Sequence, residues 1–101
     1  MSNKEFYTPR EYELFVKYDL ERRLLQKFGV KIEVKHLDKL KSPDGIIHEV
    51  DLHFSFSVDG ITFFTIVECK NWNKPVTRAM VQQLKTVMED LRANKAILFT
   101  N

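Results

Sequence analysis

An uninterrupted alternation of apolar and polar residues ends at the dipeptide Asp59-Gly60 and limits the fold more than any other feature. Apolar residues occupy every second position from Val50 to Val58, which is the period of a strand with one buried face. A second strand-like segment follows from Ile61 to Lys70. Because Asp-Gly tolerates the positive φ angles of a two-residue turn, the sequence predicts an antiparallel hairpin.

The turn also fixes which residues face each other, because pairing Val58 with Ile61 sets the register of both strands. Asp51 is then expected opposite Glu68, and Glu49 opposite Lys70, with all four side chains on one face of the sheet. The other face is expected to form core through the cross-strand pairs Val50/Cys69, Leu52/Val67, Phe54/Thr65 and Phe56/Phe63. Two opposed carboxylates repel each other, and a divalent cation between them removes that objection. The alternative is a solvated face with an ordinary Glu49/Lys70 pair.

Caps, turns and periodicity predict the remaining elements. Thr8-Pro9-Arg10-Glu11 is a capping box that starts a helix, and Gly29 stops this helix after about Phe28. The other expected elements are a short strand at 30–34, a turn at 42–45, a helix over roughly 77–92 and a buried strand at 96–99. The order αβββαβ indicates an α/β fold with a mixed central sheet flanked by helices.

Composition bounds the class of protein. The 101 residues are 44% hydrophobic and 30% charged, with no repeat or linker, so a single domain over residues 1–101 is expected. Cys69 alone cannot form an internal disulfide, which favours a reducing, cytoplasmic setting. We see no signal peptide and no apolar run of roughly 20 residues, so neither export nor a membrane span is expected. The net charge of +2 does not decide whether the partner is a polyanion.

The acidic pair lies in a pattern that resembles a known family. Asp51 on one strand and Glu68-Cys69-Lys70 at the end of the next resemble the PD-(D/E)XK nuclease superfamily, most closely its Mrr-like restriction endonuclease branch. The segments that are similar in order and spacing are Tyr12-Glu13, residues 48–52, residues 66–72 and Pro75-Val76 before a helix. The resemblance covers nearly the whole chain.

The resemblance implies a metal-dependent endonuclease that hydrolyses DNA phosphodiester bonds, with Mg²⁺ as cofactor and Mn²⁺ as a substitute. Asp51, Glu68 and the backbone carbonyl of Cys69 would bind the metal, and Lys70 would be the catalytic lysine. Pro43-Asp44 spells the motif literally, but it lies in a predicted turn, so Asp51 is preferred.

Two further catalytic residues are implied by the family. The glutamate of the first helix best matches Glu13, although Glu11 is near enough to compete and also has a capping role. A glutamine of the second helix matches Gln83, which lies on the flank of the apolar stripe, whereas Gln82 lies almost opposite that stripe. Surface-exposed side chains are the alternative for each of them.

Several residues are candidates for binding nucleic acid. Arg78, Lys85 and Arg92 recur every seven residues along the second helix, with Lys74 before it, and they could follow a phosphate backbone. Trp72 could stack on a base. Solubility and core packing are the ordinary roles of such residues. The histidines stay outside the expected site: His53 as a polar strand residue, His48 at a strand edge and His36 in solvent.

Two other functions stay open. One is a non-catalytic nucleic-acid-binding or interaction domain that keeps the nuclease fold, and the other is a nuclease acting on RNA or branched DNA. Members of the branch continue beyond the strand that corresponds to residues 96–100, so we expect C-terminal elements of the fold to be missing from these 101 residues. Family analogy also favours a homodimer, because cleaving two strands needs two active sites.

Overall fold

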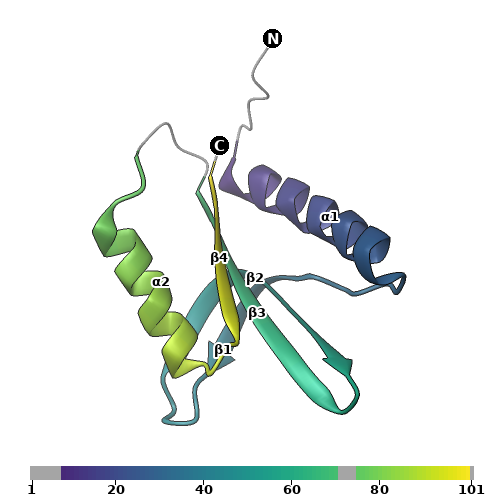
Figure 1. Ribbon diagram of the computed structural model, residues 1–101. Coiled ribbons are helices and arrows are strands. Elements are labelled where there is room, and N and C mark those ends of the chain that lie inside the picture. The colour runs from purple at the N-terminus through teal and green to yellow at the C-terminus, as the bar shows by residue number, and fades with distance from the viewer. Residues whose placement is uncertain (1–7, 71–74, 101) are drawn as a thin grey trace.

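The computed structural model describes residues 8–70 and 75–100 as two helices and a four-stranded sheet (Figure 1). The elements are α1 (Pro9–Phe28), β1 (Lys35–Lys41), β2 (Ile47–Val58), β3 (Ile61–Lys70), α2 (Arg78–Asp90) and β4 (Lys95–Thr100). The strands follow the order β1-β2-β3-β4; β4 runs parallel to β3, and the other neighbours are antiparallel. The α/β fold with a mixed sheet is therefore confirmed.

The β2–β3 hairpin has the predicted turn and register. Asp59 and Gly60 have φ angles of 51° and 80°, as a two-residue turn between twisted strands requires. The paired residues run from Val58 and Ile61 at the turn to Leu52 and Val67 at the far end. The turn alone thus set the pairing of fourteen backbone positions, seven on each strand.

Helix α1 begins and ends where the sequence predicts. The Thr8 hydroxyl accepts the Glu11 N–H at 3.1 Å, and Gly29 ends the helix in a left-handed conformation with φ 71°. One face of α1 packs on the even-numbered positions of β2 and the odd-numbered positions of β3. This core consists of Tyr12, Val16, Leu20, Ile32, Val34, Leu52, Phe54, Val67 and Cys69.

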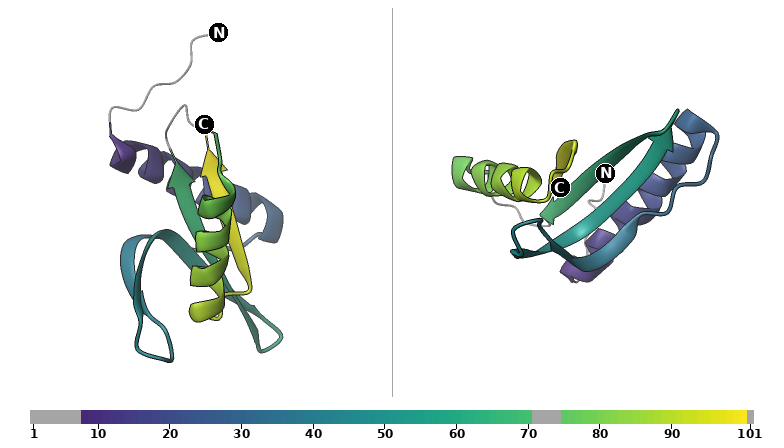
Figure 2. Two further views of the ribbon diagram at one scale, coloured as in Figure 1. Left: turned by 90° about the vertical axis from the view of Figure 1, so that its left-hand side faces the viewer. Right: turned by 90° about the horizontal axis from the view of Figure 1, so that it is seen from below.

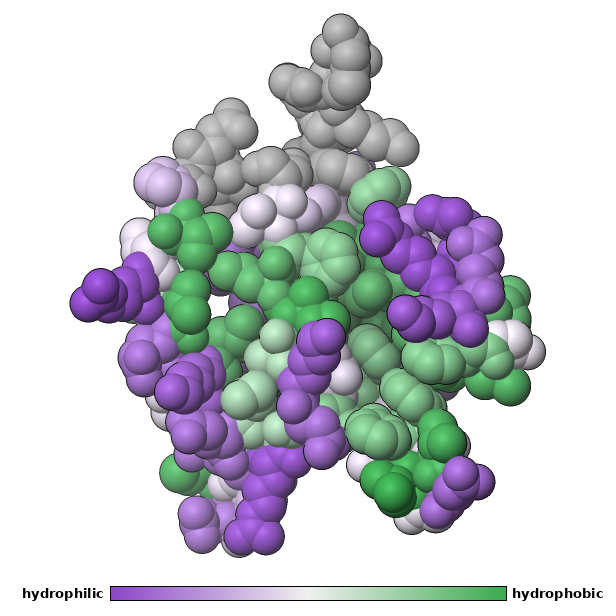
Figure 3. Space-filling model, viewed as in Figure 1, coloured by the Kyte–Doolittle hydropathy of each residue, from purple (hydrophilic) through white to green (hydrophobic). Residues whose placement is uncertain are grey.

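The predicted core pairs are buried except at the end of the hairpin. Phe56 and Phe63 stack with ring centroids 5.4 Å apart, but Phe63 is 38% exposed. The hairpin extends past α1, and apolar residues gather at its tip (Figures 1 and 3). The expectation that Phe63 forms core is wrong, because no described element covers that part of the sheet.

The strand predicted at residues 30–34 is also wrong. Ile32 and Val34 are buried as the alternation requires, but the chain there is outside the sheet, and the strand is β1, which follows it. The N–H of Val34 is bound by the carboxylate of Glu21 at 2.9 Å and not by a neighbouring strand. Alternating apolar residues show only that one side of an extended segment is buried. A connection that runs beneath a helix can have the same alternation as a strand of the sheet.

Helix α2 lies on the opposite face of the sheet from α1 (Figure 2). Thr77 caps it by accepting the Met80 N–H at 3.2 Å. None of its residues is fully buried, in contrast to three residues of α1. Neither described helix is long and apolar enough to cross a membrane. The sheet therefore has one closed face under α1 and a partly open face under α2.

Candidate active site

The open face carries the predicted acidic pair at the point where β2 and β3 stop pairing. The last backbone pair is Leu52 with Val67, one position before Asp51 and Glu68. Beyond it, the Asp51 carboxylate oxygen Oδ2 accepts the Cys69 N–H at 2.8 Å. A side chain thus takes the place of a backbone acceptor, and this hydrogen bond fixes the Asp51 carboxylate beside β3.

The Glu68 carboxyl group is strongly perturbed. Burial raises its pKa to about 8, and the hydrogen bond and the negative charge of Asp51 add to the effect. The Lys70 ammonium, with Nζ 3.6 Å from the Glu68 oxygen Oε1, opposes the shift. The two carboxyl groups are therefore close neighbours, as the register predicts. The positive charge of Lys70 does not fully offset the rise in the pKa of Glu68.

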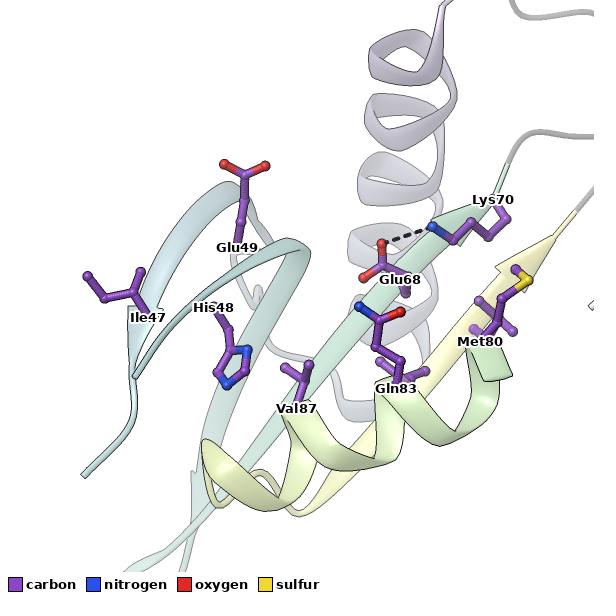
Figure 4. Close-up of a pocket in the computed structure, with 10 residues that line it drawn as sticks. Ile47, His48, Glu49, Glu68, Lys70, Met80, Gln83 and Val87 are labelled. Atoms are coloured by element: carbon purple, nitrogen blue, oxygen red, sulfur yellow. Dashed lines mark ion pairs between the residues drawn. The ribbon is translucent and has the colours of Figure 1, made fainter. Parts of the chain in front are cut away.

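A cavity of about 290 Å³ lies between Glu68 and α2, and Asp51 is not one of its lining residues. Glu68 and Lys70 line it from β3, Glu49 from β2 and Gln83 from α2. Figure 4 shows Gln83 reaching from the helix toward Glu68 and Lys70. The structure thus brings together the expected acid, lysine and glutamine at one opening.

Glu49 does not take the predicted place opposite Lys70. Its backbone partner is Lys39 of β1, and among the described residues Lys70 forms its ion pair with Glu68. In Figure 4 Glu49 lies on β2, apart from the Glu68–Lys70 pair. The strands separate after Leu52, so a register extrapolated from the turn does not hold that far.

Glu13 lies on the other side of the sheet from the cavity. Its carboxylate oxygen Oε1 is 2.7 Å from the His36 nitrogen Nε2, and both side chains are largely buried. The prediction that His36 is in solvent is therefore wrong, because α1 covers it. Glu11 stays at the helix start, where Thr8 bonds it. The structure does not bring either glutamate into the cavity.

Cys69 is buried between the acidic pair and α1. Burial raises the pKa of its thiol, and the charges of Asp51, Glu13 and Glu68 add to this effect. The side chain therefore stays a neutral thiol, so the backbone carbonyl is its expected metal-binding group. No cluster of three or more His, Cys, Asp or Glu side chains suited to a metal occurs within residues 8–70 and 75–100. Mg²⁺ is commonly held by one or two carboxylates with waters and substrate oxygens, and Asp51 with Glu68 meets that need.

The expected nucleic-acid contacts are not gathered at the cavity. At about 100° per residue, Arg78 and Lys85 lie on the side of α2 turned away from Gln83 and the other cavity-lining positions. Trp72 and Lys74 lie outside the described residues. The structure therefore does not connect the basic stripe of α2 with the acidic pair.

Sequence reasoning missed that each histidine has a carboxylate partner. His48 Nε2 is 2.9 Å from Asp90 Oδ2, which links β2 to the end of α2, and His48 lines the cavity. His53 Nε2 is 2.7 Å from Asp38 Oδ2 on β1. The partners are 42 and 15 residues apart, so no local pattern could have identified them.

Comparison with known proteins identifies the family of the chain. The family model described as a restriction endonuclease, of the Mrr catalytic type, matches residues 7–101. The chain belongs to the Mrr-like restriction endonuclease family. This Mrr-like domain has Asp51 close to Glu68, and Lys70 beside Glu68. A search of curated proteins found no match.

One solved structure shares the fold of this Mrr-like domain. It is titled as the crystal structure of a protein of unknown function, AF1548, and superposes with a TM-score of 0.59 at 21% sequence identity. The match covers 91% of this chain and 46% of that one, so the chain spans about half the length of its structural relative. At this identity the likeness concerns the fold alone.

Proposed function

We propose that this domain is an endonuclease that hydrolyses DNA phosphodiester bonds with the help of a divalent cation, Mg²⁺ or Mn²⁺. The observation that carries the proposal is the partly buried Glu68, which has Asp51 as a close neighbour and lines a cavity together with Lys70. Membership of a restriction endonuclease family supports the same chemistry.

The acidic pair fits a cation on chemical grounds. Two neighbouring carboxyl groups share one site, and the pKa of Glu68 is raised to about 8 by burial and by Asp51. A bound cation favours the ionised form of both groups and offsets the repulsion between the two carboxylates. Asp51, Glu68 and the Cys69 carbonyl would hold the ion, which supplies charge neutralisation and a more acidic water.

The other residues of the cavity have complementary tasks. Lys70 would either orient or deprotonate the attacking water, or neutralise charge that develops on the phosphate. Gln83 has an amide group that can donate a hydrogen bond to a phosphate oxygen or accept one from water. In hydrolysis, a bond forms between the water oxygen and phosphorus, and the bond from phosphorus to the leaving sugar oxygen breaks.

Cleavage of plasmid DNA by the purified protein tests the proposal. With Mg²⁺ or Mn²⁺, Glu68→Gln and Lys70→Ala should each lower the rate about 100-fold or more, as loss of one group that stabilises the transition state commonly does. Asp44→Asn is the matched control, because this exposed carboxylate lies in the turn between β1 and β2. Unchanged cleavage by Glu68→Gln would refute the assignment.

Substrate and assembly are parts of the same proposal. Parallel assays with RNA and with a branched DNA junction separate the alternative substrates. DNA binding without any cleavage in Mg²⁺ and Mn²⁺ would instead favour the non-catalytic binding domain. A homodimer is proposed because cleavage of both strands needs two active sites, and sedimentation of the DNA-bound protein measures it.

A further inference from the structure

The exposed face of β1 carries a row of lysines beside the cavity. Lys35, Lys39 and Lys41 occupy three of the four odd-numbered positions of β1, and all three are exposed. Lys39 pairs with Glu49, and Lys41 pairs with Ile47 across the β1–β2 ladder. Since Glu49 and Ile47 both line the cavity, these two lysines lie directly next to its rim on the β1 side.

The two rim lysines form no ion pair among the described residues, although Glu49 lies directly across the ladder from Lys39. Within the described parts of the chain, Lys39 and Lys41 form no ion pair, whereas Lys35 pairs with Glu33 at 3.4 Å. An unpaired ammonium group on a surface remains available to an anionic partner. Among residues 8–70 and 75–100, Lys39 and Lys41 are therefore lysines without an ion pair on this side of the cavity.

A backbone irregularity lies within this row of lysines, at Leu37. Leu37 lies between the pairs His36–Leu52 and Asp38–Val50, so its position is opposite Asp51. Its φ angle is 55°, in the left-handed region that a leucine rarely adopts, and its side chain is 48% exposed. Irregularities of this kind in a strand next to an active site redirect the chain locally. An exposed apolar residue thus lies between Lys35 and Lys39 on β1, at the register position opposite Asp51.

On the β1 side, the border of the cavity therefore carries two lysines, with Glu49 across the ladder from one of them. Arg78 and Lys85 lie on the far side of α2 and cannot contribute to this border, and Lys70 lies within the cavity itself. A phosphodiester bound at Asp51 and Glu68 belongs to a strand that continues in both directions. A strand that leaves across β2 and β1 meets Leu37 first and the two lysines beside it.

We propose that Lys39 and Lys41 bind backbone phosphates of the substrate strand where it leaves the cavity, with Leu37 contacting the sugar or base beside the scissile phosphate. This inference rests on the proposed nuclease function, and it names β1 as the surface that holds the nucleic acid. It differs from the expectation made from the sequence, which assigned phosphate binding to α2.

Binding of a 30-base-pair DNA duplex in Ca²⁺, measured against salt concentration, tests the role of β1 without requiring cleavage. The Lys39→Ala/Lys41→Ala variant should bind several-fold to tenfold more weakly at moderate salt. Its slope of log affinity against log salt should fall by about 1 for each lost phosphate contact. Lys27→Ala/Lys95→Ala is the control with the same charge change, since both of those lysines are exposed.

A small substrate separates the two proposals. Hydrolysis of bis(p-nitrophenyl) phosphate should be the same in the Lys39→Ala/Lys41→Ala variant and the parent, because this molecule has only the phosphate that reacts and no neighbouring phosphate for β1 to bind. An unchanged salt slope with normal hydrolysis overturns the inference alone, and the lysines then only protect an edge strand from aggregation. Absence of hydrolysis in the parent protein counts against the nuclease proposal, while the slope still decides the role of β1.

Discussion

At the scale of single residues, Glu68 should have the largest effect on how the stability of the protein depends on pH. Its folded-state pKa of about 8 lies above the ordinary value of 4.5, so the folded chain keeps a proton that the unfolded chain releases in this range. The free energy of unfolding of the metal-free protein should therefore decrease as pH rises from about 4.5 to about 8. The decrease should be on the order of a few kcal/mol.

Urea unfolding in EDTA at pH 5 and pH 8.5 measures this effect. Glu68→Gln cannot ionise, so its free energy of unfolding should change less between the two pH values than that of the parent. Glu89→Gln removes an exposed carboxylate from α2 and should keep the full decrease. Equal pH dependence in the parent and in Glu68→Gln would show that burial and Asp51 do not perturb Glu68.

At the scale of elements, the attachment of α2 decides the shape of the cavity. The helix has no fully buried residue, and its described side-chain hydrogen bond to β2 joins His48 to Asp90 at 2.9 Å. Because Gln83 is carried by this helix, we expect the His48–Asp90 contact to help keep Gln83 at the cavity. Few buried contacts are typical of a segment that opens locally before the rest of the domain.

Loss of this contact should loosen α2 selectively. In His48→Ala, amide hydrogen exchange of residues 78–90 should become about 5–10-fold faster, as expected for a net hydrogen bond worth roughly 1 kcal/mol. Exchange in the paired part of β2 and β3 should change less. Glu89→Ala, next to Asp90 on the same helix, should leave the exchange of α2 nearly unchanged. A uniform increase over all elements would show that His48 contributes to global stability instead.

At the scale of the whole molecule, metal binding and folding should be coupled. A cation that binds the folded chain at about ten times its Kd adds roughly 1.4 kcal/mol to the free energy of unfolding. For a domain of this size, the midpoint of thermal unfolding should rise by roughly 5–10 °C. The gain should be larger at pH 8.5 than at pH 6, because at low pH the metal competes with the proton on Glu68.

Differential scanning calorimetry with and without Mg²⁺ or Mn²⁺ tests this coupling. Asp51→Asn should lose most of the increase, and Asp44→Asn should retain it. A full increase in Asp51→Asn would place the ion elsewhere. The same pair of variants also decides between the two acidic residues that the sequence offers for the motif.

The sequence by itself determined the parts of this protein that depend on neighbours along the chain. The Asp59-Gly60 turn set the register from Val58 to Leu52, because a two-residue loop leaves the strands no other pairing. Thr8 and Gly29 determined both ends of α1 through bonds within one helical turn. The face shared by Asp51 and Glu68 followed from the alternation of side chains along each strand.

Only the tertiary structure decided the parts that depend on distant contacts. The sheet takes β1 at residues 35–41 because pairing with β2 outweighs the alternation at 30–34. His36 is covered because α1 crosses the sheet there, and Gln83 reaches Glu68 because α2 packs on the opposite face. These contacts are made between residues far apart in the chain, so the helix and strand propensities of short segments carry no information about them. The acidic pair could therefore be read from the sequence, whereas its surroundings could not.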